Sequence, residues 1–183
     1  AAKMRSELLR DLIPPEGVPF FTDLHEMISQ SISEARLIMS EMSPPVLYEL
    51  GLIPAIDWIC TQVGSMHNLQ VKFTSSYKGE QPSHEVQVML FQAARELLVN
   101  VVKHSCAKRA DVSVSGSRGI VRLTVRDDGK GFESRVSFRP DLSGGFGLFS
   151  IRERLRSLGG KLTIHSKKGQ GTRVVLVSPI VLI

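Results

Sequence analysis

Apolar residues recur at every third or fourth position over several stretches of the chain, which is the spacing that places them on one face of an α-helix. This pattern predicts helices over residues 4–12, 22–42, 46–50, 54–66, 85–104 and 148–158. Alternation of apolar and polar residues is typical of β-strands and occurs over 69–77, 110–115, 120–126, 161–166 and 172–177. We therefore expect a helical lead-in followed by an α/β domain from about residue 46.

The boundaries of these elements carry recognisable end signals. Ser43-Pro44-Pro45 ends the helix over 22–42, because a residue that precedes proline is disfavoured in the helical region. Ser83 is a good N-cap for the helix over 85–104, and Gly159-Gly160 ends the helix over 148–158. The strands over 110–115 and 120–126 should form a hairpin around Ser117-Arg118-Gly119.

The composition is that of an ordinary soluble globular protein. The chain has 183 residues, of which 42% are hydrophobic and 22% charged, and this excludes a disordered tail or a disulfide-stapled mini-protein. Its densest apolar run, residues 174–183, is too short for a membrane helix and contains Pro179. Cys60 and Cys106 are expected to be free thiols in a reducing compartment. The chain begins Ala-Ala-Lys, and we take it as a piece of something longer.

Charge is distributed unevenly between the two halves. Residues 1–90 contain 6 Lys and Arg against 11 Asp and Glu, whereas residues 91–183 contain 17 against 7. A basic C-terminal half favours an anionic partner, although a solvated basic surface would have the same composition. The cations are spread over strands, turns and helices, without a basic recognition helix or an interleaved aromatic stripe, so we expect no direct binding to nucleic acid.

The long helix over 85–104 carries a second, polar stripe beside its apolar face. Glu96, Asn100, Lys103 and His104 follow at i, i+4, i+7 and i+8 and so share one side of the helix. A carboxylate, an amide, a cation and an imidazole in line can hold a metal ion and the phosphates bound to it, because magnesium prefers oxygen ligands and keeps several waters. The alternative is an exposed face with local side-chain pairing.

Asp127-Asp128-Gly129-Lys130-Gly131-Phe132 follows a strongly alternating strand. Side chains repeat every second residue, which places Asp127 on the apolar, inward side and Asp128 on the outer side. A buried carboxylate needs hydrogen-bond donors, and an adenine amino group with a bound water would supply them. The glycines allow the backbone to turn sharply beside a flat ring. The alternative is a simple Asp-Gly turn.

A glycine cluster, Gly144-Gly145-Phe146-Gly147-Leu148, precedes the helix over 148–158. Consecutive glycines before a helix allow backbone N–H groups to converge on an anion. The cluster has neither the Gly-Lys-Ser/Thr ending of a Walker loop nor the preceding apolar strand of a Rossmann fingerprint. A flexible hinge is the alternative interpretation.

Taken together in this order, the three segments resemble the N, G1 and G2 boxes of the GHKL ATPase superfamily. The stretch from Glu96 to Ser105 resembles in particular the N box of sensor histidine kinases that signal to LuxR-type helix-turn-helix response regulators. Gly169-Gln170-Gly171-Thr172 is similar to the turn before the last strand of that family, and Ser43-Pro44-Pro45 with the residues to Leu52 is similar to its junction between the dimerisation helices and the ATPase domain.

The resemblance implies an α+β fold of the Bergerat type, a two-layer α/β sandwich with a mixed sheet and helices on one face, preceded by an amphipathic helix. It implies ATP and Mg²⁺ as cofactors, Asn100 as the Mg²⁺ ligand, and Glu96 as the catalytic residue beside the metal or its water. Lys103 and His104 should face phosphates, and Asp127 should select adenine. The other nucleotide-binding residues that it implies are Gly129, Gly131, Gly145, Gly147, Leu148 and Thr172.

The family's phosphoacceptor histidine is followed by an acidic residue and later by a glutamine, and His25-Glu26 with Gln30 matches locally. The Ser-Pro-Pro junction follows too soon for two antiparallel helices, so we interpret 22–42 as the second dimerisation helix and His25 as a chance match. The expected domains are an irregular lead-in (1–21), the end of the dimerisation and phosphotransfer region (22–45) and the catalytic domain (46–183).

We therefore expect the ATP-binding domain of a cytoplasmic sensor histidine kinase, which transfers the γ-phosphoryl group to a histidine outside this piece for relay to a regulator aspartate. Its partners would be ATP, a helix-turn-helix response regulator and, in the full-length protein, a second copy. The alternatives are an anti-sigma-type serine kinase, an ATP-driven clamp on the same fold, or a non-catalytic nucleotide-binding module.

Overall fold

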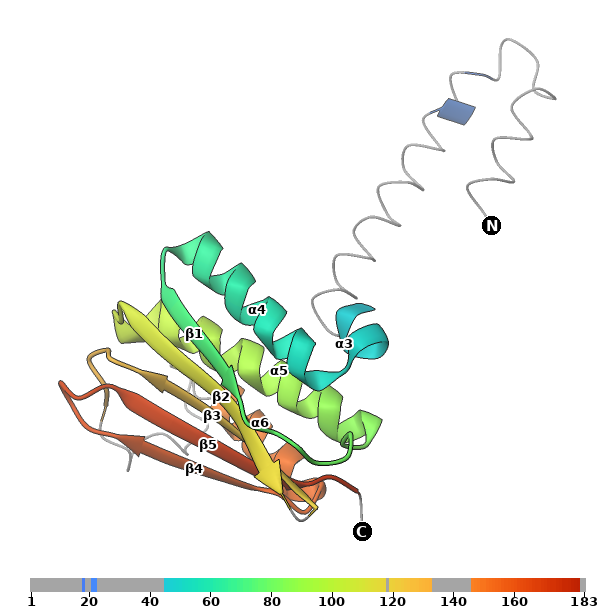
Figure 1. Ribbon diagram of the computed structural model, residues 1–183. Coiled ribbons are helices and arrows are strands. Elements are labelled where there is room, and N and C mark those ends of the chain that lie inside the picture. The colour runs from blue at the N-terminus through green and yellow to red at the C-terminus, as the bar shows by residue number, and fades with distance from the viewer. Residues whose placement is uncertain (1–17, 19–20, 23–44, 118, 133–145, 182–183) are drawn as a thin grey trace. The chain divides into compact units, whose positions relative to one another are not determined.

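The computed structural model describes Val18, Phe21, Thr22 and residues 45–117, 119–132 and 146–181 (Figure 1). The chain divides into two compact units, Ala1–Pro44 and Pro45–Ile183, and every element described below belongs to the second. The predicted helix over 4–12, residues 23–42 of the predicted helix over 22–42, with His25, and residues 133–145, with Gly145, lie outside the described residues.

A five-stranded mixed sheet forms one layer of this unit. Its spatial order is β1-β2-β3-β5-β4. β1 pairs parallel to β2, and the other neighbours are antiparallel. The strands are β1 (Gln70–Ser75), β2 (Arg109–Ser117), β3 (Ile120–Asp127), β4 (Lys161–Ser166) and β5 (Thr172–Pro179). The predicted hairpin is confirmed, because β2 and β3 pair from Ala110 with Asp127 to Ser117 with Ile120.

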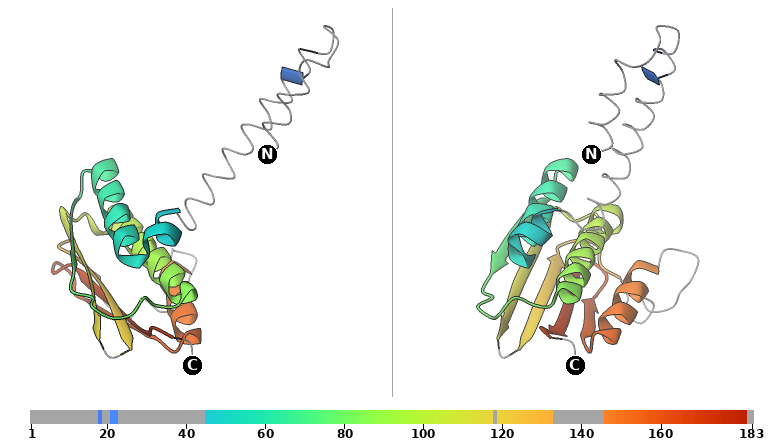
Figure 2. Two further views of the ribbon diagram at one scale, coloured as in Figure 1. Left: turned by 45° about the vertical axis from the view of Figure 1, so that its right-hand side comes forward. Right: turned by 90° about the vertical axis from the view of Figure 1, so that its right-hand side faces the viewer.

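Helices cover one face of the sheet and form the second layer (Figure 2). They are the short α3 (Pro45–Leu50), α4 (Leu52–His67), α5 (His84–Asn100) with its continuation η2 (Val101–Ser105), and α6 (Phe146–Ser157). The expected two-layer α/β sandwich with helices on one face is therefore confirmed.

The core lies between these two layers, where the apolar stripes of the helices meet alternate residues of the strands. Every second residue of β3 is buried, so that Val121, Leu123 and Val125 face the helices while Arg122 and Arg126 are exposed. The predicted apolar face of the long helix, formed by α5 and the start of η2, is likewise buried. It runs from Val86 (0% exposed) to Val101 (6% exposed). Burial of such side chains is the main force that holds helix and sheet together.

The long helix differs from its prediction at the C-terminal end. Ser83 caps α5 as expected, with its Oγ accepting a hydrogen bond from the Val86 N–H at 3.5 Å. The α-helix ends at Asn100, however, and continues as one π-helical turn over Val101–Ser105. A π-turn has more residues per turn than an α-helix and often occurs at functional sites. It therefore rotates Lys103 relative to the stripe that an unbroken α-helix would present.

Candidate functional site

A cavity of about 250 Å³ opens on the helix-covered side of the sheet, where the end of α5, η2, the start of α6 and the adjoining ends of β3 and β5 meet. Its walls combine apolar side chains from the core with a small number of polar groups. The lining residues are Leu97, Asn100, Val101, His104, Ser105, Val125, Asp127, Lys130, Gly131, Phe132, Leu148, Thr172 and Val174.

The polar stripe of the long helix reaches the cavity only in part. Asn100 and His104 line it, and Asn100 Nδ2 donates a hydrogen bond to Glu96 Oε1 at 3.4 Å. This contact leaves Oδ1 as the atom of the Asn100 amide that is available to a metal ion. Lys103 is exposed and is not among the lining residues, which agrees with the extra residue per turn in η2.

Asp127 lies at the end of β3 with only 7% of its surface exposed. Its Oδ1 accepts a hydrogen bond from the Gly129 N–H at 2.8 Å. Burial raises the pKa of the Asp127 carboxyl above its ordinary value, and the backbone N–H groups of Gly129 and Thr172 oppose that rise. The prediction from strand alternation is confirmed, because Asp127 points inward into the cavity wall.

Asp128, the next residue, is exposed, as the alternation also predicted. Its Oδ1 accepts hydrogen bonds from the backbone N–H groups of Lys108 and Arg109, at 2.9 and 3.0 Å. The Arg109 N–H above all lowers the pKa of the Asp128 carboxyl. Asp128 therefore connects the end of β3 to the start of β2 and does not line the cavity.

A hydrogen-bonded group of three strand residues supports the base of the cavity. Asp127, Thr172 and Ser166 are consecutive cross-strand neighbours on β3, β5 and β4. Ser166 Oγ lies 3.0 Å from Thr172 Oγ1 and accepts a hydrogen bond from the Phe132 N–H at 2.8 Å. Ser166 was not among the predicted site residues, because a serine at the end of a strand carries no signal until the pairing of β4 with β5 is known.

The start of α6 packs closely against the long helix. A Cβ atom at Gly147 would collide with the Glu96 carboxylate, so only glycine fits there without a shift. Glu96 itself contacts Asn100 and Gly147 but does not line the cavity. Leu148 lines it from α6. Gly129 lies behind the wall, with its N–H on Asp127, and Gly131 is part of the wall.

The apolar part of the lining was not predicted as site. Leu97, Val101, Val125 and Val174 lie on the buried faces of their elements, and in the sequence they cannot be distinguished from other core residues. Together with Asp127 they form a narrow apolar recess that has one carboxylate acceptor. Such a recess suits a flat ring that donates a hydrogen bond, and the polar Asn100 and His104 leave room for charged groups beside it.

Residues 85–181, more than half of the chain, match the family described as histidine kinase-, DNA gyrase B-, and HSP90-like ATPase. The chain belongs to this ATPase family. The matched range begins at the first turn of α5 and ends beyond β5, so it contains all of the residues that line the cavity.

Two curated relatives align with nearly the whole of this chain. The chain is 31% identical to the signal transduction histidine-protein kinase/phosphatase DegS of Bacillus subtilis (strain 168), an alignment that covers 98% of this chain and 48% of that protein. It is 29% identical to DegS of Brevibacillus brevis, over 97% and 46% of the two chains. The chain thus spans about half the length of these curated relatives.

The histidine kinase domain of the Erythrobacter litoralis EL346 blue-light activated histidine kinase has a similar fold, with a TM-score of 0.54 at 16% identity. The alignment covers 97% of this chain and 94% of that one. At this identity the likeness concerns the fold alone.

The described residues contain no group of three or more His, Cys, Asp or Glu that could hold a metal ion. A cation at Asn100 would therefore need further oxygen ligands from phosphates and water. Within the same residues, no helix is both long and apolar enough to cross a membrane.

Proposed function

We propose that this chain is the ATP-binding catalytic domain of a sensor histidine kinase and that it transfers the γ-phosphoryl group of ATP to a histidine of the full-length protein. The observation that carries this proposal is the buried Asp127 carboxylate in the wall of an apolar cavity, beside the polar face of α5 and η2. Membership in the ATPase family supports it.

Asp127 would recognise the adenine ring. Its carboxylate can accept a hydrogen bond from the exocyclic amino group of adenine, whereas guanine carries a carbonyl oxygen at that position. Leu97, Val101, Val125 and Val174 would contact the faces and edges of the ring, which favours a flat aromatic group over water. Thr172 and Ser166 would hold Asp127 and the backbone at Phe132 in place.

The triphosphate would extend toward α5, η2 and α6. Asn100 Oδ1 would hold Mg²⁺, which takes oxygen ligands and shares its coordination with phosphates and water. Glu96, whose Oε1 accepts a hydrogen bond from Asn100 Nδ2, would orient this amide or hold a metal-bound water. The metal would neutralise charge on the phosphates. His104 would donate to a phosphate oxygen from the cavity wall, and Lys103 would add positive charge from the exposed side of η2.

Two further family positions, Gly147 and Leu148, lie at the start of α6. Gly145 and Gly147 would allow the backbone to approach the phosphates, and Leu148 would contact the nucleotide from the opposite wall. Phosphoryl transfer needs little covalent participation from the protein and depends on positioning and charge neutralisation. The phosphohistidine would then pass its phosphoryl group to an aspartate of a helix-turn-helix response regulator, in a full-length homodimer.

Nucleotide titration of two neighbouring variants tests the adenine assignment. We expect Asp127→Asn to weaken ATP binding at least about tenfold, because an amide can present its NH₂ group to the adenine amino group, and to reduce the preference for ATP over GTP. Asp128→Asn is the matched control and should change the affinity little, because the Asn oxygen can still accept from Lys108 and Arg109. Equal effects of the two substitutions would contradict the assignment.

A further inference from the structure

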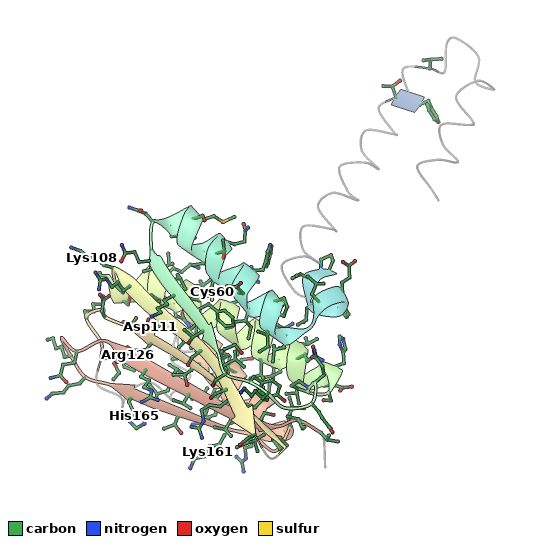
Figure 3. All side chains as sticks on the ribbon, in the orientation of Figure 1. Cys60, Lys108, Asp111, Arg126, Lys161 and His165 are labelled. Atoms are coloured by element: carbon green, nitrogen blue, oxygen red, sulfur yellow. The ribbon has the colours of Figure 1, made fainter. Side chains whose placement is uncertain are left out.

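The face of the sheet that the helices leave open carries a second, basic surface. Outward residues of three adjacent strands are basic: Arg122 and Arg126 on β3, Arg173 on β5, and Lys161 and His165 on β4. Figure 3 shows Arg126, Lys161 and His165 on the side of the sheet away from α4 and α5. This surface shares strands with the nucleotide cavity but none of the side chains proposed to bind nucleotide.

These residues form a trough with β5 as its floor. A hollow of about 410 Å³ is lined by Arg122 on one side, by Lys161, Thr163 and His165 on the other, and by Arg173, Val175 and Val177 at the base. Val175 and Val177 face away from the protein core, since Val174 and Leu176 are the β5 residues that pack with the helices. We call the lining residues together with Arg126 the trough.

The cations of the trough are not neutralised within the part of the chain that the structure describes. No ion pair joins any of the five to a carboxylate among the described residues. Asp111 is the nearest acidic neighbour in the sheet register, opposite Arg126 on β2, and no ion pair between these two is formed in the described structure. The base of the trough combines Arg173 with Val175, which is 8% exposed, and the partly exposed Val177. Such a base between two walls with unpaired charges favours a ligand with a short apolar ridge and acidic groups around it.

The dimensions of the trough match an α-helix. Its walls lie two strand spacings apart, about 10 Å, which is close to the diameter of a helix. Each wall carries two basic residues that are four positions apart, Arg122 with Arg126 and Lys161 with His165. Four positions correspond to about 13 Å along a strand. A helix covers this length in about nine residues, enough for two or three apolar side chains on one face with acidic residues on both flanks.

We propose that the trough binds an acidic amphipathic helix of a partner protein. Its apolar side chains would contact Val175 and Val177, and its carboxylates would pair with Arg122 and Arg126 on one side and Lys161 and His165 on the other. A single-stranded nucleic acid fits less well, because its bases stack on aromatic rings and the outward positions of the described strands hold no Phe, Tyr or Trp. A bilayer surface would not reach the recessed valines.

The probe is a synthetic helical peptide of roughly 18 residues, long enough to form a helix in water, with a leucine stripe flanked by glutamates. A second peptide has glutamine in place of each leucine. Binding is measured by fluorescence anisotropy with the whole chain at roughly 0.1 M salt, where long-range charge effects are screened. Vesicles with roughly one third phosphatidylserine and an oligothymidine are titrated in parallel.

Charge reversal on the two walls, Arg122→Glu with Lys161→Glu, should weaken binding of the leucine peptide at least about tenfold. The matched control is Lys72→Glu with Lys108→Glu, which changes the net charge equally outside the trough and should change the affinity by about twofold or less. Val177→Thr should weaken binding of the leucine peptide but not of the glutamine peptide. ATP affinity should be unchanged in all variants, which shows that they fold.

Four outcomes would overturn the proposal. In the first, the leucine peptide fails to bind. In the second, both double variants weaken binding of the leucine peptide equally, which would mean that only the net charge matters. The glutamine peptide binds as tightly as the leucine peptide, so the valine floor is not used. Vesicles or oligothymidine, rather than the peptide, bind in a manner that depends on Arg122 and Lys161, which would make the surface a membrane or nucleic-acid site.

Discussion

Two adjacent carboxylates, Asp127 and Asp128, have opposite environments because one strand residue points into the core and the next points to solvent. Burial raises the pKa of Asp127, whereas backbone donors lower the pKa of Asp128. The chemistry of the proposed site depends on this difference. A largely desolvated carboxylate interacts more strongly with a ligand donor than an exposed one does, so Asp127 is the residue of the pair that can discriminate between bases.

The raised pKa of Asp127 predicts a pH-dependent cost to the fold. The Asp127 carboxyl holds its proton more tightly in the folded state than in the unfolded state. Below its ordinary pKa of 3.8 the carboxyl is protonated in both states, and its burial then costs the least stability. As the pH rises through the raised value, the buried charge destabilises the protein. The free energy of unfolding of Asp127→Asn, relative to the parent, should therefore increase as the pH rises from 3.8 through the raised pKa. Urea unfolding without nucleotide measures it.

Asp128→Asn is the control for this measurement and should show the opposite trend. The lowered pKa of Asp128 means that its carboxylate stabilises the fold above pH 3.8 and that this contribution is lost as the pH falls through the lowered value. The variant should therefore lose stability relative to the parent as the pH rises. A pH-independent difference for Asp127→Asn would contradict the burial of a charged carboxylate.

Asn100 gives a second prediction at the level of single residues. If its amide oxygen holds Mg²⁺, the increase in ATP affinity that Mg²⁺ produces should fall by about tenfold in Asn100→Ala, because Glu96 alone is a poor site. The effect is measured by titrating the parent and the Asn100→Ala variant with ATP, once in the presence of Mg²⁺ and once with a chelator. An unchanged response to Mg²⁺ would mean that the polar stripe of α5 is only a solvated surface.

Three connecting segments join at the base of the cavity and position its wall. The Lys130 N–H donates to the carbonyl oxygen of Ser105 at the end of η2, at 2.7 Å, and the Gly169 N–H donates to the carbonyl oxygen of Lys130 at 2.6 Å. The turn between β4 and β5 therefore supports the segment after β3, which in turn contacts the end of the long helix. These backbone contacts explain how a glycine-rich segment can present a defined surface to a ligand.

Two glycines of the β4–β5 turn provide a matched test of this arrangement. Gly169 (φ +77°) and Gly171 (φ +71°) have similar left-handed backbones, but a Cβ atom at Gly169 meets open space, whereas one at Gly171 would collide with the Asp127 carbonyl oxygen. We expect Gly169→Ala to cost roughly 1 kcal/mol of stability. Gly171→Ala should cost more and should weaken ATP binding, as measured by urea unfolding and nucleotide titration. Equal effects on both properties would contradict the close packing.

The two faces of the sheet have different roles in the molecule as a whole. One is covered by α4, α5 and α6 and contains the proposed nucleotide cavity, and the other is open and carries the trough (Figures 1 and 3). Because strand residues alternate between these faces, Arg126 and Arg173 are in the same strand ends as Asp127 and Thr172 yet point the opposite way. A partner on the open face would leave the nucleotide accessible.

The proposed kinase activity gives a prediction for the 183-residue chain as a whole. If residues 22–42 are the second dimerisation helix, the acceptor histidine lies outside this chain, so it should bind ATP but incorporate little acid-labile label from γ-labelled ATP. A longer chain with an added upstream helix and its histidine should regain labelling. His25→Gln is the control, and strong labelling that this substitution abolishes would make His25 the acceptor and our helix assignment wrong.

Local sequence patterns were sufficient to predict most of the secondary structure, the inward direction of Asp127 and the three segments that approach the cavity. These properties are local. Helix periodicity, strand alternation, the Ser83 cap and the glycines that end a helix each depend on residues a few positions apart. The family resemblance depends on the same short segments, and the match over residues 85–181 agrees with it.

Three other features depend on how distant parts of the chain pack together. They are the place of β5 between β3 and β4, the π-turn that moves Lys103 away from the cavity, and the support of Asp127 by Ser166 through Thr172. The same strand order brings Arg122 and Lys161 to the two walls of one trough. These features could not be predicted, because strand order depends on which surfaces are buried together across long stretches of chain. Periodicity assigns a residue to a face of its own strand, but it does not identify the neighbouring strand.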